Sequence, residues 1–152
     1  MKTIEQEINQ KAFANIHVKS DINIMYTAGW IEGNLCRFFK KYGLSQQQYN
    51  VLRILRGQHP KAVMLTQITE RMIDKMSNAT RLVEKLKIKG YVTRELNERS
   101  RRQVDINITE NGLELLKIID EDMLSSNPFA HYDKLSHEEI EQLNTILDKI
   151  RN

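Results

Sequence analysis

The strongest constraint on the fold is a change of hydrophobic period near residue 90. Before it, apolar residues recur at helical spacing in a segment that Gly90 ends: Ala79, Leu82, Val83 and Leu86. After it, residues 91–96 and 103–108 alternate with the period of two that is typical of β-strands. The polar residues 97–102 separate these segments, so the sequence predicts a helix followed by a β-hairpin with a long, basic tip.

A second, shorter helix is predicted just before this one. Ile68 and Met72 form its inner face, and Thr66 is expected to cap its start. Asp74 is the expected cap of the helix that follows, which leaves a turn of only a few residues between the two. This is helix–turn–helix spacing, and a β-hairpin directly after it predicts a winged helix.

The N-terminal part of the sequence predicts a long amphipathic helix. An apolar stripe covers residues 24–42, and Gly43 is suited to end the helix. Apolar residues at helical spacing over 4–16 predict that this helix begins much earlier, with a break near residues 20–21.

Three polar side chains indicate where other helices begin. Ser45 with Gln48, and Ser136 with Glu139, have the spacing of a capping box. Thr109 is expected to cap a helix directly after the hairpin. The sequence therefore places helices on both sides of the predicted winged helix.

The predicted fold is mainly α with a small β-hairpin wing, in a single chain 1–152. Residues 44–109 would form a winged helix–turn–helix DNA-binding lobe. Residues 1–43 and 110–152 carry more apolar surface than this lobe needs for folding. They are therefore expected to be N- and C-terminal dimerisation helices. A two-fold homodimer would bind double-stranded DNA at an inverted repeat, with half-sites about one helical turn apart.

Positive charge is concentrated in one part of the sequence. Residues 75–102 carry nine Lys and Arg residues against three Glu residues, a net +6, whereas the whole chain carries +3. A basic segment on an otherwise acidic chain is typical of a nucleic-acid-binding protein. A solvated basic face has the same composition, so charge alone leaves both interpretations open.

Composition also bears on the compartment. No apolar run approaches the ~20 residues of a membrane span. The N-terminal residues are of mixed charge, unlike a signal peptide, and Cys36 is the only cysteine. We therefore expect a cytoplasmic protein that does not enter a membrane.

The order of elements resembles the MarR family of bacterial transcriptional regulators over nearly the whole chain. The matching motifs are LTQI at 65–68, ATRLV at 79–83, Leu86 to GYV at 90–92, RR at 101–102, VDINIT at 104–109 and Gly112. The resemblance implies a dimer built from the terminal helices, with the DNA-binding lobe between them. Members of the family usually repress transcription, and many are released from DNA by small, often phenolic ligands.

Two residues depart from the family pattern. Ser100 stands where an acidic residue usually precedes the arginine pair and helps to fix it. Ile73 stands where a glycine is common in the turn of the helix–turn–helix, which implies a different turn conformation in the same fold.

The helix that begins near residue 75 is the expected recognition helix. Ser77, Asn78 and Arg81 share or adjoin one exposed face, where Asn can pair with adenine and Arg with guanine. Arg81 suits a base or a phosphate contact equally, and Thr80 suits orienting the helix as well as touching DNA. Ser77 and Asn78 are also common as plain polar surface at the start of a helix.

The remaining DNA-binding candidates are basic. Arg99, Arg101 and Arg102 lie on the hairpin tip, where they could enter the neighbouring minor groove. Arg101 is the first choice for insertion, and one of the three is expected to brace the hairpin. Lys75 and Lys85 suit phosphate contacts, which add affinity and salt dependence without recognising sequence.

Other candidate sites have weaker support. Tyr26, Trp30 and Phe38 could line a pocket for an aromatic or phenolic effector, although aromatics at helical spacing are more often core. Cys36, with apolar Leu35 beside it, is more often an inert packing residue than a redox sensor. No metal or cofactor is expected, because the histidines match no ligand spacing: His17, His59, His131 and His137.

The sequence therefore predicts a homodimeric, sequence-specific DNA-binding regulator, acting as a repressor that a small ligand releases. The alternative is a winged-helix protein–protein interaction module without specific DNA binding. An enzyme is not expected, because the sequence contains no glycine-rich phosphate loop, nucleophile motif or His/Cys constellation.

Overall fold

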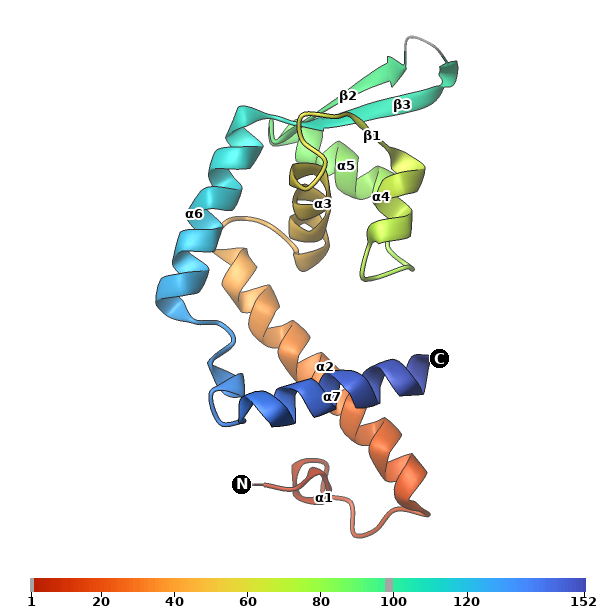
Figure 1. Ribbon diagram of the computed structural model, residues 1–152, viewed down its shortest axis with the longest axis vertical. Coiled ribbons are helices and arrows are strands. Elements are labelled where there is room, and N and C mark those ends of the chain that lie inside the picture. The colour runs from red at the N-terminus through yellow and green to blue at the C-terminus, as the bar shows by residue number, and fades with distance from the viewer. Residues whose placement is uncertain (1, 98–99) are drawn as a thin grey trace. The chain divides into compact units, whose positions relative to one another are not determined.

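The computed structural model describes residues 2–97 and 100–152, and of residues 100–102 it describes the backbone (Figure 1). The chain divides into two compact units, Met1–Tyr49 and Asn50–Asn152. The elements follow the order α1 (Ile4–Glu7), α2 (Ile16–Lys40), α3 (Gln46–Arg56), β1 (Val63–Met64), α4 (Leu65–Arg71), α5 (Ala79–Ile88), β2 (Val92–Asn97), β3 (Ser100–Ile108), α6 (Glu110–Ser126), a 3-10 turn η1 (Ala130–Tyr132) and α7 (His137–Arg151).

The first unit contains α1 and the long helix α2. The predicted break near Ser20 and Asp21 is wrong, because α2 runs through both residues and the chain breaks before Ile16 instead. The reason is Asn15, whose Oδ1 accepts hydrogen bonds from the backbone N–H groups of His17 at 2.9 Å and Val18 at 3.0 Å. This N-cap begins a new helix there. Gly43 follows α2 with a φ of +65°, as its expected role at the helix end requires.

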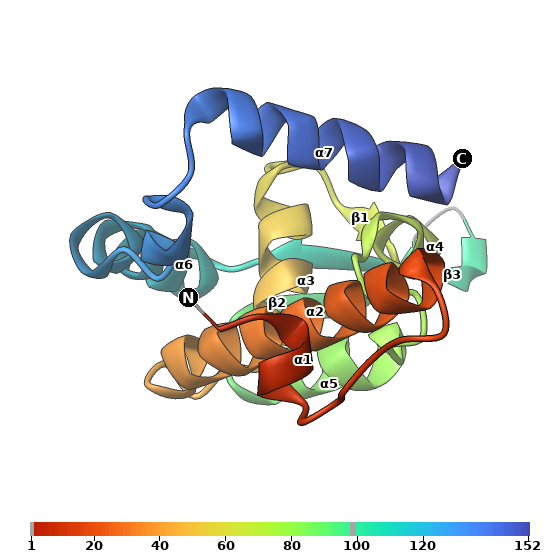
Figure 2. The ribbon, with the colours of Figure 1, turned by 90° about the horizontal axis from the view of Figure 1, so that it is seen from below.

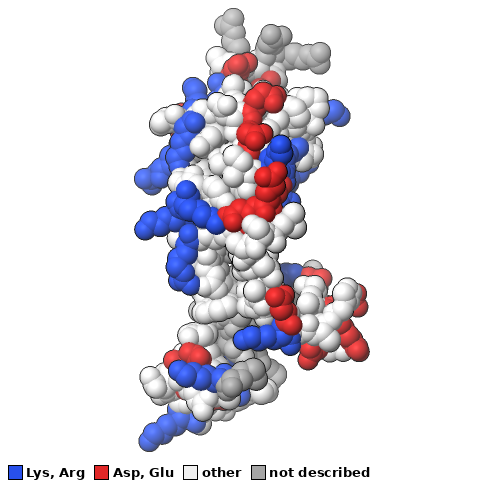
Figure 3. Space-filling model, turned by 90° about the vertical axis from the view of Figure 1, so that its left-hand side faces the viewer, with Lys and Arg blue, Asp and Glu red and all other residues white. Residues whose placement is uncertain are grey.

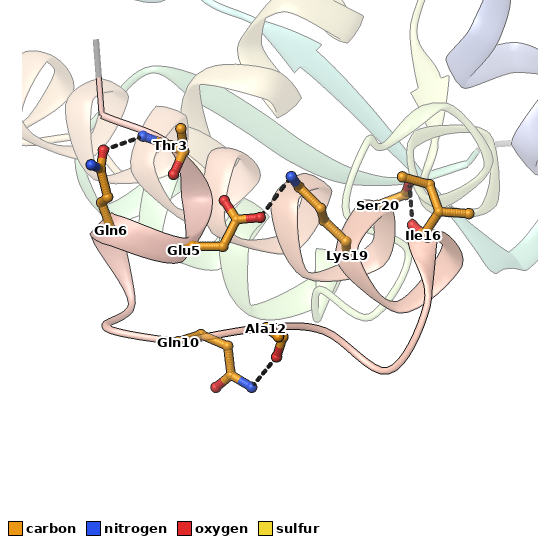
Figure 4. A network of polar contacts seen from close by, with 8 residues as sticks. All are labelled: Thr3, Glu5, Gln6, Gln10, Ala12, Ile16, Lys19 and Ser20. Atoms are coloured by element: carbon orange, nitrogen blue, oxygen red, sulfur yellow. Dashed lines mark hydrogen bonds and ion pairs between the residues drawn. The ribbon is translucent and has the colours of Figure 1, made fainter.

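Helix α1 lies alongside the first half of α2 (Figures 2 and 4). Two contacts fix it there. Lys19 Nζ lies 2.7 Å from Glu5 Oε1, and the Tyr26 hydroxyl donates to Glu7 Oε2 at 2.9 Å. The hydrogen bond from Lys19, helped by a backbone N–H, lowers the pKa of Glu5 from 4.5 to about 2. The carboxylate of Glu7 raises the pKa of Tyr26, because ionising the phenol would break their hydrogen bond.

The start of α3 confirms the predicted capping box. Ser45 N donates to Gln48 Oε1 at 3.0 Å, and Gln48 N donates to Ser45 Oγ at 3.1 Å. This pairing satisfies the amide oxygen of Gln48, a side chain that is only 5 % exposed. Nearby, the rings of Phe39 and Tyr49 stack with their centroids 4.3 Å apart.

A three-stranded antiparallel sheet of order β1-β3-β2 lies in the second unit. The predicted pairing of the hairpin is confirmed, with Val92 opposite Ile108 and Leu96 opposite Val104 before the register shifts at Asn97. The long tip expected over residues 97–102 is wrong, because Asn97 belongs to β2 and pairs with Ser100, where β3 already begins. Strand β1 was not predicted, and its Val63 pairs with Ile106. Figure 1 shows α3, α4 and α5 together on one side of this sheet.

The core of the second unit is built from these helices, the sheet and α6. Each element contributes apolar side chains that are at most 2 % exposed: Val51, Leu52, Leu55, Val63, Ile68, Met72, Val83, Leu86, Val92, Ile106, Leu116 and Ile119. The predicted inner faces of the helix–turn–helix are confirmed. Ile68, Met72, Val83 and Leu86 lie in this core, and Ala79 is only 6 % exposed. Leu82 is the exception, because it is half-buried.

Thr109 joins the hairpin to α6. Its Oγ1 accepts from Gly112 N at 3.2 Å, as expected of a cap, and donates to Gly90 O at 2.7 Å. Its own N–H donates to Tyr91 O at 3.0 Å. Helix α6 packs so closely here that a Cβ on Gly112 would lie 2.4 Å from Tyr91 O. The approach of α6 to the end of α5 therefore depends on a glycine at this position.

Helix α7 presents an exposed apolar stripe. Its capping box is confirmed, with Ser136 N donating to Glu139 Oε2 at 2.7 Å and Glu139 N donating to Ser136 Oγ at 3.2 Å. Ile146 is 54 % exposed and Ile150 is 59 % exposed. No helix in the described parts of the chain is long and apolar enough to span a membrane.

Candidate nucleic-acid interface

The turn between α4 and α5 differs from the predicted one. Asp74 does not cap α5. Its Oδ1 accepts from Met76 N at 3.0 Å and its Oδ2 accepts from Ser77 Oγ at 2.6 Å, which closes a separate turn before the helix. The cap is Asn78, whose Oδ1 accepts from Arg81 N at 3.0 Å, so α5 begins at Ala79. Asp and Asn are about equally good caps, and the tertiary position of the turn decides between them.

The start of α4 also differs. The predicted cap, Thr66, lies inside the helix, which begins at Leu65. Gln67 Oε1 accepts instead from the backbone N–H of Met64 at 3.0 Å. Strand β1 ends at Met64, so the helix follows the strand directly and a Thr66 cap has no room.

The turn is also held from α3. Asn50 Oδ1 accepts from Ile73 N at 3.0 Å. Ile73 itself has no positive φ, since within residues 2–97 and 100–152 only Asn9 and Asn127 do among the non-glycine residues. The glycine that is common in related turns is therefore not needed here. Sequence reasoning missed Asn50, because its partner is a backbone group 23 residues away.

The expected base-contacting residues lie at the N-terminal end of α5. Asn78, Thr80 and Arg81 are exposed, and Ser77 is half-buried. The cap uses one lone pair of Asn78 Oδ1 and leaves the amide protons as donors, so a bidentate contact with adenine remains chemically open. The hydroxyl proton of Ser77 is used by Asp74, which leaves Ser77 as an acceptor for base amino groups.

Basic residues lie close in the sequence to these expected base-contacting residues. Residues 70–89 carry six Lys and Arg residues against three Asp and Glu residues. Lys85 is exposed on α5, and Lys75 hydrogen-bonds the carbonyl of Glu70. Arg94 on β2 lies 3.0 Å from Glu84 on α5, which ties the wing to the helix. On the face that Figure 3 draws, Lys and Arg gather mainly along one edge of the upper part, beside a central band of Asp and Glu.

The tip of the wing falls partly outside the described residues. This applies to Arg99 as a whole and to the side chains of Arg101, Arg102 and Ser100. The base of the tip is described. There Asn97 Nδ2 donates to both carboxylate oxygens of Asp105, at 2.9 and 3.1 Å, across the two strands. This contact follows the shift of register and was not expected from the sequence.

An ion pair joins α3 to α6 within the second unit. Asp120 Oδ2 lies 2.6 Å from Arg56 Nη1, and Asp120 Oδ1 lies 3.7 Å from Arg53 Nη1. The arginines are three residues apart on α3, so both reach the same carboxylate. Sequence spacing gives no signal for this contact, because Asp120 is 64 residues from Arg56.

The candidate effector residues all lie on α2. Tyr26 and Trp30 are 39 % and 47 % exposed. Phe38 is half-buried and packs edge to face on Phe39, with ring centroids 5.3 Å apart. Cys36 is an exposed free thiol. In the parts of the chain that the structure describes, no group of three His, Cys, Asp or Glu side chains could hold a metal ion.

Comparison with known proteins shows which family the sequence of this lobe matches. The family model described as "MarR family" matches residues 44–104. The regulator PecS of Dickeya dadantii, an HTH-type transcriptional regulator, is 28 % identical over 110 residues, which cover 68 % of this chain and 66 % of PecS.

Solved structures of MarR-like regulators are also similar to this chain. A putative MarR-like transcription regulator from Bacillus cereus is 26 % identical, with a TM-score of 0.73 over 85 % of this chain and 91 % of that one. MepR of Staphylococcus aureus, solved as a complex with DNA, shares the fold at 16 % identity, with a TM-score of 0.75 over 86 % of this chain and 94 % of MepR. Residues 44–104 therefore match the MarR family, and the chain as a whole is similar to winged helix–turn–helix transcriptional regulators of that family.

Proposed function

We propose that this protein is a homodimeric regulator that binds double-stranded DNA at an inverted repeat and represses transcription. One observation carries the proposal. Asn78, Thr80 and Arg81 are exposed on the first turn of α5, whereas Val83 and Leu86 of the same helix are buried. The helix thus turns its polar, basic N-terminal face outward, as a recognition helix must to enter a major groove.

Dimerisation is supported by apolar surface outside residues 44–109. Met25 on α2 is 73 % exposed, and Leu124 on α6 is 85 % exposed. On α7 no residue is buried at all, although the helix has an apolar stripe. Water-exposed stripes of this kind are expected to be covered by a second copy of the chain, with residues 1–43 and 110–152 forming the interface.

Release from DNA by a small aromatic or phenolic ligand is the second part of the proposal. It rests on the family and on the exposed rings of Tyr26 and Trp30. A ligand would act by favouring a spacing of the two recognition helices that does not match the half-sites. As a regulator of transcription, the protein would work in the cytoplasm, where bacterial DNA is found.

The test is equilibrium binding of the full chain to duplex DNA. A site selected from a random pool is compared with a scrambled duplex of the same composition, at several salt concentrations. We expect the selected site to bind at least about 10³-fold more tightly, and both affinities to fall steeply with salt.

The outcome separates the proposal from its alternative. Equal affinity for both duplexes, or affinity that is indifferent to salt, would favour a winged-helix module that binds another protein. Sedimentation of the free protein and of its complex then checks for two chains per duplex.

A further inference from the structure

Two large apolar side chains are exposed in the turn between α4 and α5. Ile73 is 79 % exposed and Met76 is 94 % exposed, whereas Met72 in the same turn is 2 % exposed. Scattered apolar residues are common on protein surfaces. Here, however, two of them lie in one short turn directly before the residues that are expected to contact bases.

Their exposure is a built feature of the turn. Asp74 holds the backbone of Met76 and the hydroxyl of Ser77, and Asn50 holds the backbone of Ile73. These hydrogen bonds fix the backbone on both sides of Met76 while leaving its side chain in solvent. Because this backbone is already fixed, a contact with a ligand would have to order only the side chain of Met76.

The surroundings indicate what would cover Met76. It directly precedes Ser77 and the cap Asn78, and it lies in a segment with twice as many basic as acidic residues. A basic surface complements DNA rather than an apolar protein partner. The major groove offers one apolar group, the 5-methyl group of thymine, which side-chain carbon atoms can contact.

We propose that Met76, flanked by Ile73, contacts a thymine 5-methyl group in the major groove and so selects thymine beside the base that Asn78 contacts. The inference rests on the proposed function, because it requires α5 to enter a major groove. It adds an apolar contact to a site that otherwise recognises DNA through hydrogen bonds and charge.

The experiment removes the methyl group from the DNA. A duplex is selected from a random pool with the wild-type chain, and each thymine is then replaced in turn by deoxyuridine, which lacks only that methyl group. We expect one position per half-site to lose about fourfold in affinity, the factor that corresponds to one buried methyl group.

Protein variants assign the effect to Met76. Met76→Gln keeps the length of the side chain but makes it polar, and it should bind the thymine and deoxyuridine duplexes equally well. Met76→Leu should keep a preference for thymine. Ile88→Ala is the matched control, because Ile88 is 84 % exposed at the other end of α5 and should leave the preference unchanged.

The outcomes distinguish the inference from the function on which it rests. If the wild-type chain selects no sequence, both fail. If it selects a site that tolerates deoxyuridine at every position, or if Met76→Gln retains the full preference, the thymine contact is wrong and specific DNA binding stands.

Discussion

The carboxylate of Asp120 on α6 lies 2.6 Å from the guanidinium of Arg56 on α3, and it is the main polar link between those helices among the described ion pairs. The two side chains are 37 % and 30 % exposed, so water screens the pair. Asp120→Asn should therefore lower the free energy of unfolding by no more than about 1 kcal/mol.

Urea denaturation measures this loss, and a double-mutant cycle with Arg56→Gln isolates the pair. Asp148→Asn is the matched control, since Asp148 pairs with Arg151 on the exposed surface of α7 and its loss should be undetectable. A coupling energy of zero in the cycle would show that the pair of Arg56 and Asp120 does not stabilise the contact between α3 and α6.

Gly112 should not tolerate a methyl group. A Cβ there would lie 2.4 Å from Tyr91 O and 2.8 Å from Ile108 Cγ1, so α6 would have to shift. Gly112→Ala should destabilise the protein by about 1–3 kcal/mol, which is the usual cost of overpacking. Thermal unfolding measures the change.

Gly29 provides the control for that substitution. It also lies in a helix, but a Cβ there would meet nothing within 4 Å. Gly29→Ala should stabilise the protein by about 0.5–1 kcal/mol, because alanine is the better helix former. Opposite signs for the two variants would establish that the close approach at Gly112 causes the loss.

Thr109→Val should remove both hydrogen bonds of the hydroxyl while keeping the shape of the side chain. The lost cap alone costs about 1 kcal/mol. The carbonyl of Gly90 also loses its donor. Thr109→Ser should restore most of the stability in chemical denaturation, whereas a valine variant as stable as wild type would contradict the bridging role.

Asn78 caps α5 and is proposed to contact a base, and substitution can separate the two roles. Serine caps a helix about as well as asparagine does, but it cannot pair bidentately with adenine. Asn78→Ser should leave stability nearly unchanged and reduce discrimination at one base pair by about 1–3 kcal/mol. Asn78→Ala should lose both. Unaltered sequence preference in the serine variant would remove Asn78 from the base contacts.

Glu5 should give α1 an acid-sensitive attachment. Its pKa is lowered from 4.5 to about 2, so the folded form is favoured by the ionised carboxylate. That contribution is fully present above pH 4.5 and is lost as the pH falls through about 2. An NMR titration of the Glu5 carboxyl follows it. Lys19→Ala should raise the pKa towards 4.5, and Lys11→Ala should not change it.

Local signals in the sequence were enough to predict most of the elements. The capping residues Ser45, Thr109 and Ser136 are each satisfied within three residues, so spacing alone identifies them. Strand β1 could not be predicted, because two residues carry no detectable alternation and pair only through β3.

The start of α5 shows a different limit of prediction from sequence. Asp74 and Asn78 are both plausible starts for α5 in the sequence. The structure selects Asn78, and the turn before it is held from another helix by Asn50 through the backbone of Ile73, a contact that the sequence does not reveal. The wing arginines Arg99, Arg101 and Arg102 stay predictions, as do the contacts of Arg81 and Lys85 with DNA.

The hydroxyl of Thr109, which hydrogen-bonds Gly90 O and Gly112 N, also has a consequence for operator spacing. It links the end of α5 to the first turn of α6, so a change in the direction of α6 is expected to carry α5, the proposed recognition helix, with it. Helix α6 has 17 residues and is therefore about 25 Å long. In the proposed dimer, if α6 tilted by about 10° about the end that lies far from Thr109, α5 would move by about 4 Å. This displacement is larger than the rise from one base pair to the next.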